Sequence, residues 1–289
     1  MNTTVAVGYD RTRPGEHALG VAAREAARRS GSLLVISAYH WLTPPEPHSM
    51  TPADTEATAR KAAEEIAQYG AGRVRERHPD LPVEARAVAG YAGKVLAAAS
   101  HEADLLVVGN RGTGGFHGLM LGSTSMRTLA EACCPVIVAR GDTDDTHNRI
   151  IAAVDIDTDC DTILAFAFEE ASRRAAGLTV THVWDEPWIV AYGQQDPGIA
   201  DDVARIERER DDRLTALVQT AQAKQPDVHA FHQLAIGSAS GLLVEASHRA
   251  DLLVTGARRH GEGRHGMLIG PVTQTLLQHA ECPVAVVPQ

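Results

Sequence analysis

The chain has 289 residues, which is long for one domain and comfortable for two. Hydrophobic residues make up 44% of it and charged residues 22%, as in an ordinary globular protein, while a formal net charge of −10 disfavours a nucleic-acid-binding surface, which needs a basic face. No apolar run reaches the length of a membrane-spanning helix and the N-terminus lacks signal-peptide features, so we expect a cytoplasmic protein with no membrane partner.

The first half of the chain alternates apolar, strand-like runs with segments of helical periodicity. Strands are predicted at residues 5–9, 33–38, 83–88, 105–108 and 135–139. Helices are predicted between them, at residues 14–30, 51–77 and 90–101 and from Ser123 onward. Because alternating strands and helices favour a parallel sheet covered on both faces, we expect a doubly wound α/β domain.

A glycine-rich stretch follows the buried strand at residues 105–108. It begins with Gly109 and Gly112, and nine residues then separate Gly112 from Gly122. Glycines let the backbone approach a ligand closely, and a helix N-terminus offers unpaired N–H groups and a partial positive charge. The stretch therefore predicts an anion site, most often a phosphate site. Further hydroxyl donors would come from the start of the helix, at Ser123, Thr124 and Ser125.

An aspartate ends the first predicted strand. In open α/β sheets, ligands bind beyond the carboxyl ends of the strands, at the point where the winding direction reverses. If the first and fourth strands flank that point, Asp10 and Gly109 lie side by side. Asp10 would then be a partner for a metal ion or a ribose. An equally good interpretation is that Asp10 only starts the following helix.

The order of elements repeats after a polar, acidic linker at residues 141–148. Asp155 corresponds to Asp10 at a shift of 145 residues, and Cys282 corresponds to Cys134 at a shift of 148. A shift this steady indicates two tandem domains of one fold, which we place at residues 1–141 and 148–289.

The spacing Gly109-x2-Gly112-x9-Gly122-Ser123, after a strand and together with Asp10, resembles the universal stress proteins. The likeness covers nearly the whole chain, twice. It implies a five-stranded parallel sheet in the order 3-2-1-4-5 in each domain, and ATP binding, often with magnesium. It also implies antiparallel pairing of last strands, either between the two halves as a pseudo-dimer or between two chains as a homodimer.

The resemblance also assigns residues to the nucleotide in the first domain. Asp10 would lie near the ribose and the metal, and Ala38 and Val108 would frame the adenine. The ribose and phosphates would be held by Gly109, Arg111, Gly112, Gly122, Ser123, Thr124 and Ser125.

The second domain departs from this pattern. Arg259 stands where the second glycine would be, and Pro271 replaces the serine, which removes an N–H group and a hydroxyl. A phosphate site is therefore expected to be degenerate there, although some of the set remains at Asp155, Gly256, Gly270, Val272 and Thr273. The cationic residues Arg258, Arg259 and His260 would bind a different anion, hold ATP in another way, or form a solvated loop, and we favour the loop.

The leading functional hypothesis is an ATP-binding regulatory or stress-response protein. One alternative is an ATP-hydrolysing or adenylating enzyme, but the chain has no His-x-Gly-His signature and no Gly-x-Ser-x-Gly elbow, so no catalytic residue is assigned and at most slow ATPase activity is expected. Another alternative is a dimerisation module without nucleotide, because the predicted edge strands at residues 135–139 and 283–287 invite pairing.

Overall fold

A computed structural model of the protein describes residues 3–40, 52–111, 121–141, 146–185, 197–259 and 267–289. The chain divides into two compact units. The first unit consists of Met1–Arg140, Arg258–Ile269 and Pro288. The second unit consists of Gly141–Ala257, Gly270–Val287 and Gln289. The domain limits 1–141 and 148–289 remain predictions, and the segment Arg258–Ile269 groups with the first unit although it belongs to the second half of the sequence.

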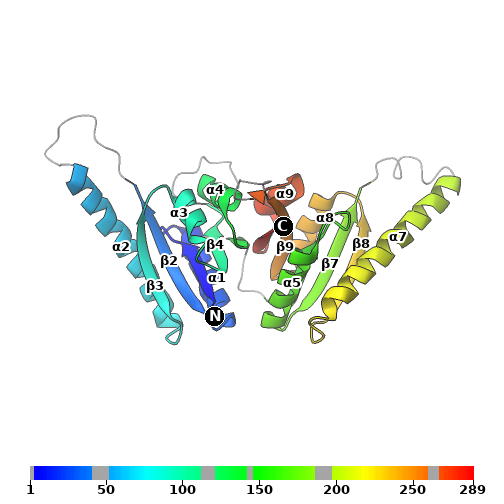
Figure 1. Ribbon diagram of the computed structural model, residues 1–289, viewed down its shortest axis with the longest axis horizontal. Helices are drawn as coiled ribbons and strands as arrows, with labels where there is room; N and C mark the ends of the chain where they lie inside the picture. The colour runs from blue at the N-terminus through cyan, green and yellow to red at the C-terminus, as the bar shows by residue number, and fades with distance from the viewer. Residues whose placement is uncertain (1–2, 41–51, 112–120, 142–145, 186–196, 260–266) are drawn as a thin grey trace. The chain divides into compact units, whose positions relative to one another are not determined.

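The first unit is a doubly wound α/β fold (Figure 1). Its strands are β1 (Thr4–Gly8), β2 (Ser32–Tyr39), β3 (Val83–Ala89), β4 (Leu105–Gly109) and β5 (Val136–Ala139). Its helices are α1 (Arg13–Arg28), α2 (Pro52–Arg77), α3 (Ala92–Ala99) and α4 (Ser123–Glu131). The strand order is β3-β2-β1-β4-β5 with parallel pairing, which confirms the order 3-2-1-4-5 expected from the sequence.

Helix α1 begins where the sequence carries capping signals. The side chain of Thr12 accepts a hydrogen bond from the Gly15 amide over 3.1 Å, and Pro14 lies in the first turn, where its missing N–H costs nothing. The helix buries Ala18, Leu19 and Ala22 against the sheet. This start places the N-terminus of α1 directly after the end of β1.

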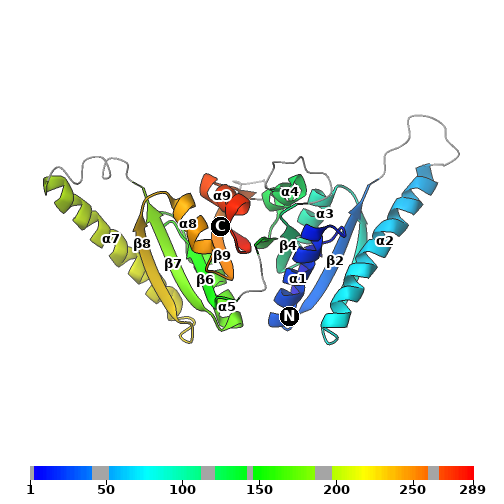
Figure 2. The same ribbon diagram turned by 180° about the vertical axis from the view of Figure 1, so that it is seen from behind.

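The second unit repeats the same architecture (Figure 2). Its strands are β6 (Arg149–Ala153), β7 (Gly177–Trp184), β8 (Ala230–Ile236), β9 (Leu252–Arg259) and β11 (Val284–Pro288). The last two residues of β9 pair with the two-residue strand β10 (Met267–Leu268), within the segment Arg258–Ile269 that groups with the first unit. Its helices are α5 (Asp161–Arg174), α7 (Pro197–Gln222), α8 (Ala239–Ser247) and α9 (Pro271–His279). The order β11-β9-β6-β7-β8 corresponds to that of the first unit read from β5 to β3.

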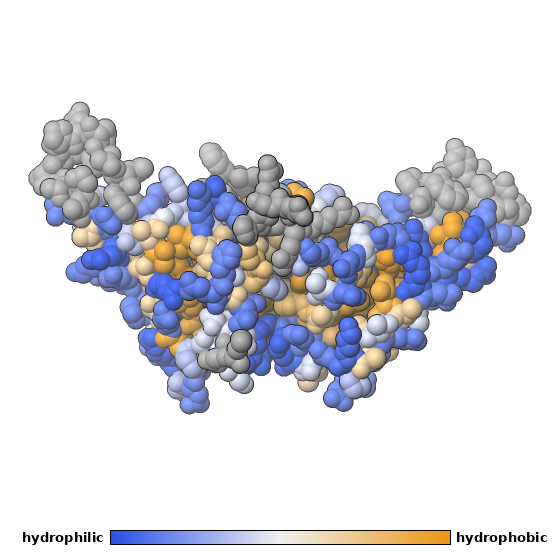
Figure 3. Space-filling view, viewed as in Figure 1, coloured by the Kyte–Doolittle hydropathy of each residue, from blue (hydrophilic) through white to orange (hydrophobic). Residues whose placement is uncertain are grey.

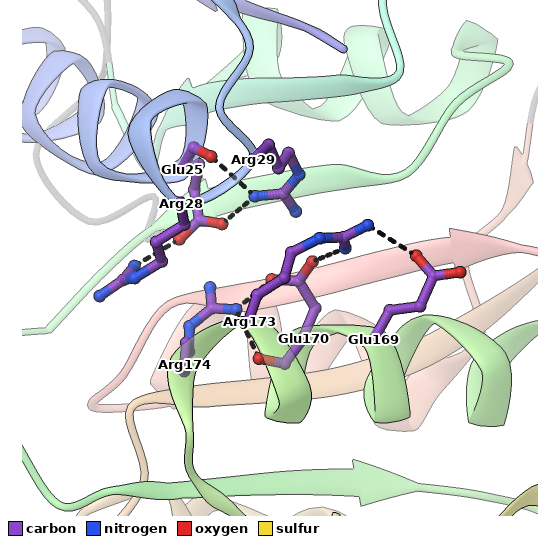
Figure 4. Close-up of polar contacts among 7 residues, drawn as sticks. All are labelled: Glu25, Arg28, Arg29, Glu169, Glu170, Arg173 and Arg174. Atoms are coloured by element: carbon purple, nitrogen blue, oxygen red, sulfur yellow. Dashed lines mark hydrogen bonds and ion pairs between the residues drawn. The ribbon is translucent and has the colours of Figure 1, made fainter. Parts of the chain in front are cut away.

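A buried ionic cluster occupies the same position in both units, near the C-terminus of the first helix. Glu25 is 2% exposed and pairs with Arg28 over 2.8 Å and with Arg29. Glu170 is fully buried and pairs in the same way with Arg173, over 2.9 Å, and with Arg174 (Figure 4). The shared spacing of one carboxylate and two arginines supports the tandem repeat inferred from the sequence.

The outer helices have the polar surface expected of solvated helices. The visible faces of α2 and α7 are mainly hydrophilic in the space-filling view (Figure 3). Among the described residues, no helix combines the length and the apolar character needed to cross a bilayer.

Candidate functional site

The carboxyl ends of β1 and β4 lie side by side. The two strands are parallel neighbours, with Val7 opposite Val107. A Cβ atom at Gly109 would lie 2.9 Å from the carbonyl oxygen of Pro14, and one at Gly15 would lie 2.5 Å from Asp10 Oδ1. The first turn of α1 therefore touches both the end of β4 and Asp10, and the fold brings Asp10 and Gly109 to the same edge, as the sequence predicted.

Asp10 has a clear structural role. Its Oδ1 atom accepts hydrogen bonds from the Thr12 amide, over 3.0 Å, and from the Thr12 hydroxyl, over 2.6 Å. These bonds form the turn that starts α1, as in the alternative interpretation of this residue. The side chain is exposed, and its Oδ2 atom has no hydrogen-bond partner within the described part of the chain. One carboxylate oxygen therefore remains available to a ligand.

The two residues expected to frame the adenine share one face of the sheet. A Cβ atom at Gly8 would lie 2.6 Å from Leu96 of α3, so Gly8 points toward the face that α3 covers. Asp10 lies beyond β1, which ends at Gly8, and its Oδ1 atom contacts the first turn of α1. Because side chains alternate along a strand, the registers Gly8–Ile36 and Val7–Val107 put Ala38 and Val108 on the same face as Gly8. Ala38 is half-buried and Val108 is buried.

Two hydrogen bonds tie the ends of the glycine stretch together. The Gly122 amide donates to the carbonyl oxygen of Asn110 over 2.8 Å, and the Ser125 hydroxyl donates to the carbonyl oxygen of Gly109 over 2.6 Å. The donors expected for a ligand at Gly122 and Ser125 are therefore engaged within the protein. Gly112 lies outside the described residues.

The first turn of α4 leaves three amides open. Gly122 is the N-cap and the helix begins at Ser123, as the sequence predicted, and the first helical bond runs from the Met126 amide to the Gly122 carbonyl over 3.0 Å. The amides of Ser123, Thr124 and Ser125 precede that bond, and none has a partner among the residues that the structure describes. Ser123 is exposed and Thr124 is half-buried, so their hydroxyls are also accessible. Arg111, at the other end of the stretch, is exposed.

The donor set fits a phosphate better than it fits a metal ion held by protein alone. No group of three or more His, Cys, Asp or Glu side chains within the described ranges could hold a metal. Mg²⁺ is usually bound by one or two carboxylates together with phosphate oxygens and water, so Asp10 could serve as one ligand only beside a bound nucleotide.

The corresponding edge of the second unit keeps part of this arrangement. Asp155 is exposed, and its Oδ1 atom accepts a hydrogen bond from the Asp157 amide over 3.1 Å. The Thr273 hydroxyl donates to the carbonyl oxygen of Gly256 over 3.1 Å, as Ser125 does to Gly109. Gly270 is the exposed N-cap of α9, Pro271 is its first helical residue, and Val272 is half-buried.

The expected solvated loop after Gly256 is wrong for its first residues. Strand β9 continues to Arg259, and Arg259 and Arg258 pair with Met267 and Leu268 of β10 in an antiparallel ladder. The chain stays extended because β10 supplies a hydrogen-bonding partner for these two residues. His260 lies outside the described residues.

Sequence reasoning missed the contacts made by Arg11. This residue adopts a left-handed backbone conformation, with φ of 61°, and its guanidinium contacts α2. No local pattern indicated this contact, because Glu65 and Tyr69 of α2 lie more than 50 residues away in sequence. The Thr12–Pro14 pair, in contrast, is a readable helix-start signal.

The sequence model of the universal stress protein family matches residues 1–140 and again residues 146–288. A universal stress protein of Mycolicibacterium smegmatis is 30% identical, over 98% of this chain and 96% of that protein. A universal stress protein of Mycobacterium tuberculosis strain H37Rv is 28% identical, over 99% of this chain and 97% of that protein. The crystal structure of a universal stress protein from Archaeoglobus fulgidus is similar in fold, with a TM-score of 0.71 at 16% identity over 99% of this chain and 98% of that one.

Proposed function

Because the chain belongs to the universal stress protein family, we propose that its first domain binds ATP and that the protein acts as a nucleotide-dependent regulatory or stress-response protein. In this proposal the phosphates bind the first turn of α4 and the loop that leads to it. Asp10 contacts the ribose or a magnesium ion, and Ala38 and Val108 lie beside the adenine.

The observation that supports this proposal most directly is the open first turn of α4. Three backbone amides without partners in the described chain point out of a helix N-terminus, where the helix dipole favours negative charge. They lie beyond the carboxyl end of β4, next to the strand that leads to Asp10. A triphosphate has the charge and the acceptor oxygens to use all three amides.

We propose that the second domain binds ATP weakly or not at all. The first position of α9 is Pro271, which has no amide to donate, and the extended end of β9 takes the place of a turn after Gly256. Asp155, Gly256, Gly270, Val272 and Thr273 remain the candidate contact residues there.

The direct test is equilibrium dialysis of the folded protein with labelled ATP, with and without magnesium. We expect one ATP per chain, bound in the first domain. No binding at millimolar ATP to protein with a native circular-dichroism spectrum would overturn the proposal. A binding ratio of two, with both sites equal in affinity, would contradict the asymmetry between the domains.

We propose no catalytic residue. ATP turnover well above that of a heat-inactivated sample, and lost in Asp10→Ala, would instead favour an enzyme. A homodimer and a cytoplasmic location remain predictions, which light scattering on the purified chain and fractionation of cells would test.

A further inference from the structure

The residue after Asp10 links the candidate site to the outer helix. The Arg11 guanidinium donates from Nη2 to the carbonyl oxygen of Glu65 over 3.1 Å, and its Cζ atom lies 4.4 Å from the centre of the Tyr69 ring. Glu65 and Tyr69 are one turn apart on α2, so Arg11 holds the turn that follows β1 against a single face of that helix. We call Arg11, Glu65 and Tyr69 the loop clamp.

Further contacts connect the loop clamp back to β1. Arg73 lies 6.0 Å from the centre of the Tyr69 ring and pairs with Glu16 of α1 over 3.4 Å. Glu16 accepts a hydrogen bond from the hydroxyl of Tyr9, the residue before Asp10. Both neighbours of Asp10 are therefore held, one through α1 and one through α2.

The second unit makes the same connection with different residues. Arg210 and Arg213 of α7 donate to the two carboxylate oxygens of Asp157 over 3.0 and 2.9 Å, and Arg213 also donates to the carbonyl oxygen of Ile156 over 2.7 Å. Here the cations are on the helix and the carboxylate is on the turn, the reverse of the first unit. Two unrelated sets of side chains join the same turn to the same helix, which indicates that the connection itself matters.

The backbone of Arg11 makes the loop clamp more than a surface contact. A left-handed conformation is unfavourable for a residue with a side chain, and such a residue is usually held by its surroundings. Arg11 directly follows Asp10, whose Oδ1 atom is committed to the same turn. The orientation of the remaining oxygen, Oδ2, therefore depends on how the turn is held.

We propose that Arg11 is a positioning residue that sets Asp10 for the nucleotide and couples occupancy of the nucleotide site to α2. This inference rests on the proposed ATP binding. Binding that shifts Asp10 must also shift Arg11 relative to Glu65 and Tyr69, and by reciprocity a partner that moves α2 must change the affinity for ATP. Helix α2 is then the element through which the nucleotide state reaches a partner.

Three variants of the full chain separate two contributions of Arg11 to the coupling, that of its backbone conformation and that of its side-chain contacts. Arg11→Ala removes the loop clamp and keeps the unfavourable backbone conformation, whereas Arg11→Gly removes the loop clamp but tolerates that conformation. Tyr69→Leu removes the aromatic platform without touching the turn. The matched control is Arg60→Ala, an arginine of the same helix whose side chain is 60% exposed and pairs only over 3.8 Å with Glu64 among its described contacts.

Two measurements are made on each protein: ATP affinity by equilibrium dialysis, and hydrogen exchange of peptides covering α2 with and without ATP. In the wild type and in Arg60→Ala, ATP should change exchange along α2. In the three loop-clamp variants that change should be lost, and ATP affinity should fall about tenfold, within the usual range of coupling between sites. A variant that is only less stable would still show a change in α2 exchange when ATP is added. Loss of that change therefore reports the coupling and not the stability.

The outcomes distinguish the two proposals. Suppose that the wild type binds ATP, and that Arg11→Gly and Tyr69→Leu keep both its ATP affinity and its α2 response. This result would overturn the inference about Arg11 but would agree with the proposed function. A folded wild type that binds no ATP would overturn both.

Discussion

The Ser125 hydroxyl donates a hydrogen bond to the carbonyl oxygen of Gly109 over 2.6 Å, across a stretch of 16 residues. Thr273 and Gly256 make the same contact in the second unit over 3.1 Å. Both hydroxyls are buried in the first turn of a helix, and both carbonyls belong to the strand that precedes it. The contact fixes the helix N-terminus relative to the strand in both halves, including the half whose phosphate site is expected to be degenerate.

Removing this hydroxyl should loosen the candidate phosphate site. Ser125→Ala leaves the Gly109 carbonyl without that donor, and we expect a loss of about 1 kcal/mol in unfolding free energy and weaker ATP binding. Urea denaturation and equilibrium dialysis measure the two effects. Ser125→Thr is the matched control, because the second unit already uses threonine there. Unchanged affinity in Ser125→Ala would show that the contact does not position the site.

One substitution gives α4 the proline that begins α9. Ser123→Pro removes one open amide and one hydroxyl, and proline is tolerated at the first helical position, so stability should change little. ATP affinity should fall about tenfold or more, because hydrogen bonds to a charged phosphate are stronger than neutral ones. Dialysis gives the affinity and a urea midpoint gives the stability. Equal affinity in both proteins would exclude the Ser123 amide from the site.

The buried ionic clusters should be important for stability. Glu25→Ala and Glu170→Ala each remove a buried carboxylate that pairs with two arginines, and breaking such pairs typically costs about 3–5 kcal/mol. Glu209→Ala breaks an exposed pair with Arg205, which solvent screens, and should cost much less. Urea unfolding of the three variants tests the difference, and equal losses would contradict it.

The contact between Asp157 and α7 should depend on pH. The hydrogen bond from Arg210 is the largest cause that lowers the pKa of Asp157 in the folded state; burial opposes it, and the hydrogen bond from Arg213 adds to the lowering. The folded state therefore loses its proton at lower pH than the unfolded chain, so the stabilisation is complete above the unfolded pKa and is lost as pH falls through the folded one. The unfolding free energy of the wild type minus that of Asp157→Asn should shrink between about pH 6 and about pH 3.

The control for this comparison is Asp212→Asn, an exposed carboxylate on α7. If the difference in unfolding free energy between the wild type and Asp157→Asn stays constant over this pH range, the two arginines do not lower the pKa of Asp157. Because Asp157 is half-exposed, added salt should weaken the effect.

The four cysteines should differ sharply in reactivity. Burial raises the pKa of Cys134 to about 12, and burial followed by the charge of Asp155 raises that of Cys160 to about 11, so neither forms thiolate readily. Cys282 is 2% exposed. Cys133 is only half-buried, with its Sγ atom 3.6 Å from His101 Nε2. In maleimide labelling followed by peptide mass spectrometry, Cys133 should react first and the others only on unfolding, and Cys133→Ser should abolish the fast phase.

The sequence by itself determined the elements of this protein and their repetition. The alternation of apolar strands with periodic helices, the cap at Thr12 and Pro14, and the prolines and glycines between elements predicted the α/β fold closely. The long helix expected at residues 51–77, for example, is found as Pro52–Arg77. These features could be read because they depend on neighbours a few residues apart, where helix and strand periods and capping act.

Only the tertiary structure decided which groups of the candidate site are free. The Gly122 amide and the Ser125 hydroxyl looked available in sequence but are bonded to Asn110 and Gly109, and the chain after Gly256 extends as a strand because it has a partner in β10. The contact of Arg11 with α2 also joins residues that no local pattern connects. Hydrogen bonds between distant segments depend on how the sheet brings strand ends and helix starts together, so the sequence could name candidate residues but not which of their donors are free.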